Sequence, residues 1–436
     1  MPVQSLVPRL PPAAWRILGA DALSAVGTGL TLPFLMVYLH TVCGFAVEVA
    51  GSVLATFGLV SLVGNPLGGW LSDRCGPQRP LVAGLALSAL GTAGWAVVSQ
   101  PWHAFTAATI AALGISVCWP AQSALLASVV ETHQRTSVFS VGHMTLNMGL
   151  GTGALIAALL VDPRQLGTFT LLYLLDAVTF LAAAGIVALG APLSGAGSTR
   201  GPQEGAALRD RQSGYRHVVR DGVLVLLWLI TALLVTAGFA QFHIAIPIVA
   251  VEAGVPAHRL GMIFAVNTIG VVVFQLVALR MVRSRRRTRV AMILAVLWAM
   301  CWCIVILAVR LPPGPLVLAT LLTASAVFAL GEVLLAPTLP ALVNDIAPER
   351  LRGRYNGAHT LAYTVGFVVG PLLSASALGN GETVLLLVGL TSVCLATVPL
   401  IYVLERRLNP AVNLTPGRLA GSDISDDDPN VSTPAR

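Results

Sequence analysis

Long apolar runs separated by short polar turns make up most of the chain. Twelve such runs can be distinguished. Most are about twenty residues or longer, the length at which an α-helix crosses the hydrocarbon core of a bilayer. Strands of a membrane barrel would instead be about ten residues long and alternate in polarity. The pattern predicts an all-α membrane protein with transmembrane helices at residues 14–40, 46–71, 80–99, 103–130, 138–161, 168–190, 222–250, 259–281, 289–310, 315–343, 357–378 and 382–404.

A polar segment in the middle of the chain divides the predicted spans into two groups of six. Residues 191–221 are rich in Gly, Ser, Pro and Arg, which predicts a cytoplasmic linker between a six-helix bundle at 1–190 and another at 222–407. Residues 408–436 contain the acidic run DISDDDPN and are expected to form a disordered cytoplasmic tail.

The two groups of six also share sequence. The segment that begins at Pro120 aligns without a gap with the segment that begins at Pro337, at a constant offset of 217 residues. The identical pairs are Pro120 and Pro337, Ala124 and Ala341, Leu125 and Leu342, Arg135 and Arg352, Gly149 and Gly366, Gly153 and Gly370, and Leu155 and Leu372. Parallel six-helix repeats occur in secondary carriers, in which the substrate path runs between the repeats near the bilayer midplane.

The composition agrees with a membrane protein and indicates its orientation. Apolar residues make up 56% of the chain, charged residues make up 10%, and the mean hydropathy is +0.82. All 26 basic residues are Arg. Numbering the turns by the span that precedes each, we assign all of them except Arg164, Arg259 and Arg310 to the N-terminus and the even-numbered turns. Because positive charge stays in the cytoplasm, both termini are expected there. The net charge of +7 therefore indicates contact with the lipid bilayer and gives no reason to expect nucleic acid.

Neither a cofactor nor a metal is expected. The six cysteines show no metal-ligand spacing and no disulfide framework. The sequence contains no phosphate-binding loop and no nucleophile elbow, which argues against an enzyme and against the use of ATP. The first span is too long for the core of a signal peptide and is expected to be retained.

The stretch GGWLSDRCGPQRP, residues 68–80, concentrates polar residues between the second and third predicted spans. Its small residues allow close helix contact, and Asp73 can accept hydrogen bonds from the N-terminus of a neighbouring helix. Arg74 and Arg79 are expected to hold the turn at the anionic membrane face. In a carrier that alternates between two states, such a cluster stabilises one state and must break for the other. We therefore expect a conformational latch at Gly69, Asp73, Arg74, Gly76 and Arg79.

This stretch resembles the loop motif G-x-L-a-D-R-x-G-R-K-x-x-L of the major facilitator superfamily. The matching residues are Gly69, Leu71, Asp73, Arg74, Gly76, Arg79 and Leu81. The sequence departs from the motif at Pro77 and Gln78, where the family usually has basic residues. The resemblance extends over essentially the whole chain, because twelve spans, two halves, a long central loop and the arginine-rich turn RMVRSRRRTR are all present.

Three acidic residues fall within predicted spans. Each would cost about 2.5–3.5 kcal/mol on insertion scales, so Asp21, Asp176 and Glu332 are candidates for function. In this superfamily spans one, four, seven and ten line the central cavity, which implies that Asp21 and Glu332 face the substrate path and Asp176 does not. No Lys or Arg is expected deep enough to pair with them, and a carboxylate desolvated without a partner binds a proton more readily.

The remaining polar residues limit the substrate. No basic residue is expected in the cavity, which disfavours phosphate and organic anions and favours lipophilic, neutral or cationic compounds. Polar contributions are expected from Gln241 and His243 on span seven and from Asn267 on span eight. His243 is also a candidate proton carrier, although a single helical His is more often a structural hydrogen-bonding residue.

Two further patterns bear on the direction of transport. Gly149 and Gly153 keep the glycine spacing of the antiporter motif G-x-x-x-G-P-x-x-G-G, but Ala154 replaces its proline. Span eleven carries the fuller version as Gly366, Gly370 and Pro371. Span four lacks the arginine of the family motif L-x-R-x-x-Q-G, since Ile110 stands at that position if Gly114 is its glycine. The acidic residues are thus the simpler sites for proton coupling.

The chain most resembles the drug:proton antiporter branch with twelve spans. The expected function is proton-coupled export of small lipophilic or cationic compounds, as in multidrug or natural-product efflux, by a monomer in a bacterial inner membrane. A proton-coupled importer of a small metabolite, such as a sugar or nucleoside, would share the fold. A receptor or scaffold without transport activity also remains open.

Overall fold

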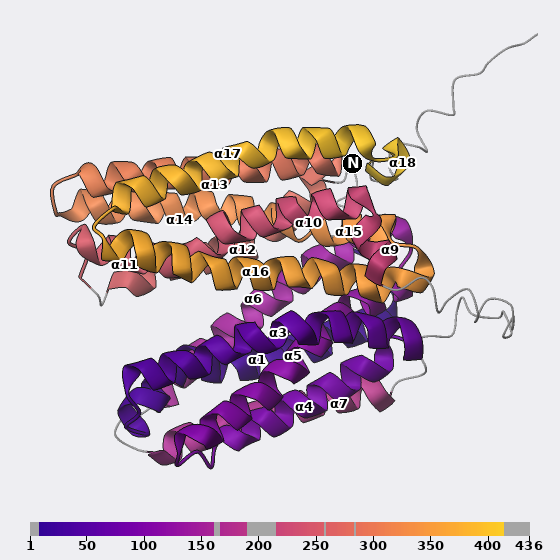
Figure 1. Ribbon diagram of the computed structural model, residues 1–436, viewed down its shortest axis with the longest axis horizontal. Helices are drawn as coiled ribbons and strands as arrows, with labels where there is room; N and C mark the ends of the chain where they lie inside the picture. Colours follow the sequence, from indigo (N-terminus) through magenta and orange to yellow (C-terminus); the bar gives the residue numbers. More distant parts are fainter. Residues whose placement is uncertain (1–7, 161–165, 190–214, 257–258, 283–284, 414–436) are drawn as a thin grey trace, which may run out of the picture.

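The computed structural model describes residues 8–160, 166–189, 215–256, 259–282 and 285–413. These residues form an all-helical molecule of two bundles, which lie one above the other in Figure 1. The predicted linker lies outside the described residues except for residues 215–221, which include the short helix α9 (Tyr215–Arg220).

The first bundle contains six long helices. They are α1 (Pro12–Thr31), α3 (Val47–Cys75), α4 (Gln78–Trp95), α5 (Pro101–Val129), α6 (Arg135–Leu160) and α7 (Leu166–Leu189). The short α2 (Leu35–Val37) follows α1. Buried apolar residues of α1, α4, α5, α6 and α7 form an apolar core in this bundle.

The second bundle repeats this arrangement, with two of its spans interrupted. One span consists of α10 (Gly222–Leu234), a π-helical turn and α11 (Ala240–Glu252), and another consists of α14 (Pro315–Leu335) and α15 (Leu339–Ile346). The others are α12 (Leu260–Val282), α13 (Arg287–Arg310), α16 (Arg352–Gly379) and α17 (Thr383–Arg407). The short α18 (Pro410–Asn413) packs beside α13, where Asn413 bonds both the backbone and the hydroxyl of Thr288. The ordered chain therefore continues past residue 407, where the sequence places the start of the tail.

Ten helical segments of the described chain are long and apolar enough to cross a membrane. The helices at the third and fifth predicted spans, α4 and α6, are not among them. The α4 helix has 18 residues and begins with Gln-Arg-Pro, and α6 carries several Thr, Ser, Asn and His residues. Both pack within the first bundle against apolar neighbours, so their lower hydropathy reflects contact with protein.

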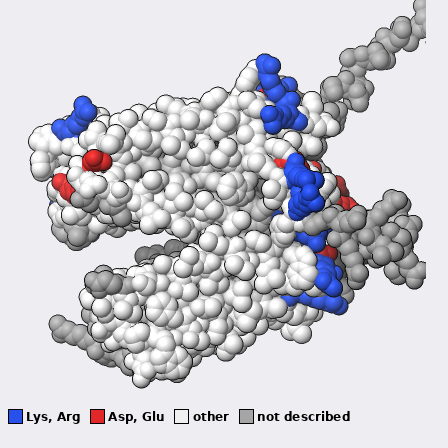
Figure 2. Space-filling model, in the orientation of Figure 1, with Lys and Arg blue, Asp and Glu red and all other residues white. Residues whose placement is uncertain are grey.

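The two bundles meet mainly along three helix pairs of the described chain, α3 with α16, α6 with α12 and α5 with α16. Figure 2 shows the bundles in contact at the end where most of the visible arginines gather, and separated by a cleft at the opposite end. We call the first of these the arginine-rich end; there α3 and α12 finish and α6, α13 and α16 begin. The described ends of the chain, near α1 and α18, lie at this same end (Figure 1).

Candidate transport site and bundle contacts

Glu332 lies close to the middle of the span Pro315–Ile346 and is joined to side chains from both bundles. Its Oε2 accepts a hydrogen bond of 2.9 Å from Nδ2 of Asn267 on α12, and its Oε1 lies 3.3 Å from Nε2 of His143 on α6. The Glu332 side chain is 2% exposed and that of His143 is 14% exposed. The carboxyl group is thus enclosed at the contact between α6 and α12 with both oxygens engaged.

The sequence predicts Asn267 as a polar contributor but does not identify His143. The expectation that Glu332 has no partner is wrong, because the partner is a histidine from the other bundle rather than a nearby Lys or Arg. One signal was available: His143 and Asn147 stand one helical turn apart in a predicted span, and one turn apart they share a helix face. In the structure Nδ2 of Asn147 lies 3.2 Å from Nε2 of His143.

Asp21 and Asp176 occupy two different environments in the first bundle. Asp21 lies near the middle of α1, and Gln122 on α5 is its hydrogen-bonding neighbour. Asp176 on α7 is buried and accepts a hydrogen bond of 2.8 Å from the hydroxyl of Thr31 on α1. Asp176 therefore joins two helices of one bundle. No contact of the described residues brings Asp21 or Asp176 to Glu332.

Gln241 is buried and joins the helix of span seven to that of span eleven. Its Nε2 donates to the carbonyl of Gly370 at 2.9 Å, and its Oε1 accepts from the hydroxyl of Ser374 at 2.5 Å. Because both ends of the amide are used within the bundle, Gln241 fixes α11 against α16.

His243, one helical turn from Phe239, is exposed and surrounded by aromatic rings. Its Nδ1 lies 3.0 Å from the carbonyl oxygen of Phe239, and its ring stacks on Phe264 of α12 with centroids 6.0 Å apart. Phe239 in turn contacts Phe367 of α16, which is 40% exposed. Since α12 and α16 both contact the first bundle, this aromatic cluster lies on the side of the second bundle that faces the first. Phe264 precedes Asn267 by one helical turn, so the cluster adjoins the Glu332 site.

The predicted latch joins the bundles at the arginine-rich end. Asp73 lies on the last turn of α3, and not in a turn after it, because α3 continues to Cys75. Its carboxylate accepts hydrogen bonds from the backbone N–H of Gly353 at 2.6 Å and of Arg354 at 3.0 Å. These are free N–H groups of the first turn of α16, where the helix dipole also favours an anion.

Close backbone contact makes this arrangement possible. A Cβ on Gly69 would lie 2.5 Å from the carbonyl oxygen of Gly353, and a Cβ on Gly353 would lie 2.3 Å from that of Gly69. Gly76 adopts a φ of 79°, which ends α3 and lets the chain turn into α4. Arg74 packs over the ring of Trp70 at 5.2 Å, and Arg79 is exposed at the start of α4. The contact between bundles therefore comes from Asp73 and the glycines.

A second charged contact joins the bundles at the same end. Asp345, in the last turn of α15, accepts a hydrogen bond of 2.5 Å from Nη1 of Arg135 at the start of α6. The other oxygen of Asp345 pairs with Arg287 at the start of α13, which is 1% exposed. One carboxylate thus binds an arginine from each bundle. The sequence alone does not predict this group.

The glycines of the antiporter-like motif pack helices within each bundle. A Cβ on Gly149 would lie 2.7 Å from Cβ of Ala25, and a Cβ on Gly153 would lie 2.0 Å from the carbonyl oxygen of Val26, both on α1. On α16, Gly366 packs in the same way against Val235.

The other two positions of this motif lie further along α16. Gly370 lies against Ala240, and Pro371 stands inside the helix. The two halves thus use equivalent glycines to bring span five against span one and span eleven against span seven.

No group of three or more His, Cys, Asp or Glu side chains among the described residues is arranged to hold a metal ion.

Comparison with known proteins agrees with this architecture. The family model described as Major Facilitator Superfamily matches residues 17–256 and 242–421. A Na(+), Li(+), K(+)/H(+) antiporter of Planococcus maritimus is 25% identical, covering 79% of this chain and 84% of the relative. Multidrug resistance protein MdtH of Yersinia enterocolitica is 26% identical, covering 80% of this chain and 82% of the relative.

The fold also matches a solved structure. A bacterial homologue of the iron transporter ferroportin, crystallised in an outward-facing state, superposes with a TM-score of 0.75 at 15% identity, covering 91% of this chain and all of that one. The matched family consists of transporters and not of enzymes, and it is helical and multi-pass. The chain belongs to the Major Facilitator Superfamily and is a membrane transporter of the secondary type.

Proposed function

We propose that this protein exports small lipophilic cations across a bacterial inner membrane in exchange for protons, by alternating access. The observation that carries the proposal is the enclosed carboxyl group of Glu332, held between the two bundles by His143 and Asn267. A group in this place senses the relative position of the bundles and can also bind a cation. Because one chain contains both bundles, a monomer suffices for transport.

The surroundings of Glu332 support exchange of a proton for a cation. His143 Nε2 lies between a carboxylate acceptor and the Asn147 amide donor. When Nε2 carries a proton it donates to Glu332, and when it does not it accepts from Asn147. Protonation from the outside would neutralise the carboxylate and release a bound cation outward. Loss of the proton to the cytoplasm would restore the anionic site.

The aromatic cluster supports a lipophilic substrate. Phe239, Phe264, Phe367 and His243 present ring faces and edges one turn from the Glu332 site. Aromatic faces attract organic cations and bury apolar groups. A compound with an aromatic body and a single positive charge would place its charge at the carboxylate and its body on the rings.

The two bundles are in contact at one end of the molecule and separated at the other, which supports an outward-facing state. By the positive-inside rule the arginine-rich end lies in the cytoplasm, and there Asp73 and Asp345 hold the bundles together. The cleft opens at the other end (Figure 2). The multidrug relative and the proton antiporter relative support export by exchange.

Exchange of a monovalent metal cation for protons is a second candidate. It is favoured by the relative named as a Na(+), Li(+), K(+)/H(+) antiporter and by the enclosed carboxylate, which a small cation could bind. Import of a small metabolite would use the same bundles in the opposite direction.

The test is transport in proteoliposomes of known orientation, with tetraphenylphosphonium as the lipophilic cation and an imposed pH gradient. The wild-type protein should accumulate tetraphenylphosphonium against its gradient, driven by protons moving the other way. Glu332→Gln should lower this rate at least tenfold, because the amide binds neither proton nor cation. Asp176→Asn, which changes an acid of similar burial within one bundle, should retain transport.

The other outcomes separate the alternatives. Gradient-driven flux of Na⁺ or K⁺ without tetraphenylphosphonium transport would favour the second candidate. Movement of substrate in the same direction as protons would favour import. Unchanged transport by Glu332→Gln would contradict the proposed site.

A further inference from the structure

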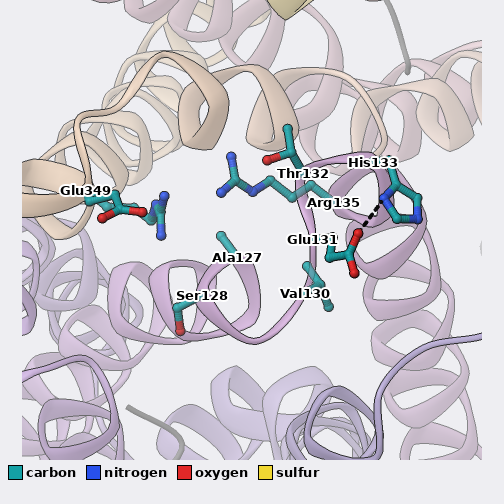
Figure 3. Close-up of a pocket in the computed structure, with 9 residues that line it drawn as sticks. Ala127, Ser128, Val130, Glu131, Thr132, His133, Arg135 and Glu349 are labelled. Atoms are coloured by element: carbon teal, nitrogen blue, oxygen red, sulfur yellow. Dashed lines mark ion pairs between the residues drawn. The ribbon is translucent and has the colours of Figure 1, made fainter. Parts of the chain in front are cut away.

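A pocket of about 510 Å³ lies at the arginine-rich end, between the connection from α5 to α6 and the start of α16. Residues 127–135 of the first bundle form most of its wall, and Glu349 and Arg352 of the second bundle close it (Figure 3). Because both bundles contribute, the pocket exists in this form only while they are in contact at this end.

The internal repeat explains why a charged group faces this pocket without a counter-ion. The offset of 217 residues relates Arg135 to Arg352 and Ser128 to Asp345. On one side of the pseudo-twofold axis Arg135 binds Asp345 across the bundles. On the other side the equivalent residues are Arg352 and Ser128, and both line the pocket. The repeat therefore places a serine where a carboxylate would complete the second contact.

The neighbouring groups do not supply the missing charge. The hydroxyl of Ser128 donates to the carbonyl of Leu125 at 2.7 Å. Glu131 is turned to the ring of His133, with Nδ1 and Oε2 3.1 Å apart (Figure 3). Glu349 and Asp345 lie close enough to attract Arg352 electrostatically, but neither carboxylate forms an ion pair with it within the described residues. The Nε of Arg352 is buried and makes no hydrogen bond.

We infer that this pocket binds a small soluble oxyanion of the phosphate class, at the position that the repeat leaves without a carboxylate. A phosphate oxygen would pair with the Arg352 guanidinium, and the hydroxyl of Thr132 on the pocket wall offers a second donor. The equivalent contact, Arg135 with Asp345, lies across the pseudo-axis between the bundles. The pocket is therefore reached from the aqueous phase at this end rather than from the lipid around the bundles.

Binding at this place stabilises the state in which the bundles meet at the arginine-rich end. An anion at ten times its dissociation constant would shift the equilibrium towards that state by about 11-fold. This effect does not depend on which substrate the protein carries, so its test is independent of the transport assay.

The experiment measures thermal unfolding of the purified full-length protein in detergent, with inorganic phosphate compared with chloride at equal ionic strength. Phosphate should raise the Tm by about 2–4 °C. Arg352→Gln should abolish this shift, and Arg352→Lys should keep part of it. Arg216→Gln, which removes an exposed arginine of α9 outside the pocket, should respond like the wild type.

A complementary variant supplies the missing charge. Ser128→Asp should pair with Arg352 as Asp345 pairs with Arg135, so that the protein becomes more stable without phosphate and no longer responds to it. A wild-type Tm that ignores phosphate, or an equal response in Arg352→Gln, would overturn the inference. A shift that depends on Arg352 but appears only with a short-chain anionic phospholipid would overturn the soluble source and assign the phosphate to the membrane.

Discussion

At the scale of single residues, Glu332 and Asp73, two of the acidic groups that join the bundles, differ in what they bind. Glu332 binds side chains, an imidazole and an amide, whose hydrogen-bonding roles change with protonation. Asp73 binds backbone N–H groups of α16, which keep their protons. The first arrangement suits the proposed exchange of a proton for a cation, and the second suits a fixed anion that breaks its contact only when the bundles move apart.

Asp73→Asn tests the second role. An asparagine can offer one neutral oxygen to the two N–H groups, and each hydrogen bond to a charged group contributes about 1.5–3 kcal/mol. We expect the transport rate to fall at least tenfold while the amount of protein in the membrane stays at the wild-type level, as measured by vesicle transport and immunoblotting. Wild-type transport by this variant would show that the contact is dispensable.

The sequence predicts the acidic residues of the candidate site and of the bundle contact, but it does not predict the basic residues with which buried acids pair. Glu332 and Asp73 stand out because a charge is costly in an apolar run or is part of a known motif. His143 does not stand out, because its role depends on the docking of α6 against α12 of the other bundle. The same holds for Asp345 and Arg287, which are far apart in the chain and meet only in the assembled fold.

At the scale of helices, glycine spacing determines how closely neighbouring spans approach. Hydropathy predicts where most spans lie but is weaker for α4 and α6, which are less apolar. It also ends α3 too early, because the polar residues at its end continue the helix and contact α16. The π-helical turn at Val235–Phe239 in span seven contains Gly238, which packs on Trp298, and the pattern of apolar residues reveals neither feature.

Gly153→Val tests the packing of α6 on α1. Its Cβ would lie 2.0 Å from the backbone carbonyl of Val26, which has little freedom to move. Overpacking of this kind costs about 1–3 kcal/mol, so the Tm in detergent should fall by several degrees. Gly185→Val on α7 is the matched control, since no atom lies within 4 Å of its added Cβ. Equal stability of the two variants would contradict the packing role.

At the scale of the whole molecule, the proposed transport cycle requires the two bundles to move as units about the helix pairs that join them. The cores of the two bundles are almost entirely separate, and polar contacts such as that of Asp345 with Arg135 join the bundles at the arginine-rich end. Polar contacts of this kind can break and re-form during a transport cycle at lower cost than an apolar core. The closed end therefore works as a gate.

A cross-link between α3 and α16 tests the gate. Nδ2 of Asn65 lies 2.7 Å from the hydroxyl of Thr364. In a background without native cysteines, Asn65→Cys with Thr364→Cys should form a disulfide that stops transport until a reductant is added. Ser61→Cys with Ser116→Cys, a pair 2.8 Å apart inside the first bundle, should cross-link without stopping transport. Continued transport by the oxidised bundle-to-bundle pair would exclude separation of the bundles at this end.

The exchange of a proton for a cation at Glu332 is the central claim, and proton release on binding tests it most directly. The purified protein in weakly buffered detergent solution is mixed with tetraphenylphosphonium while a pH indicator is monitored. The wild type should release protons in proportion to the cation bound, and Glu332→Gln should release none. Binding by the wild type without proton release, or equal release by Glu332→Gln, would contradict the account.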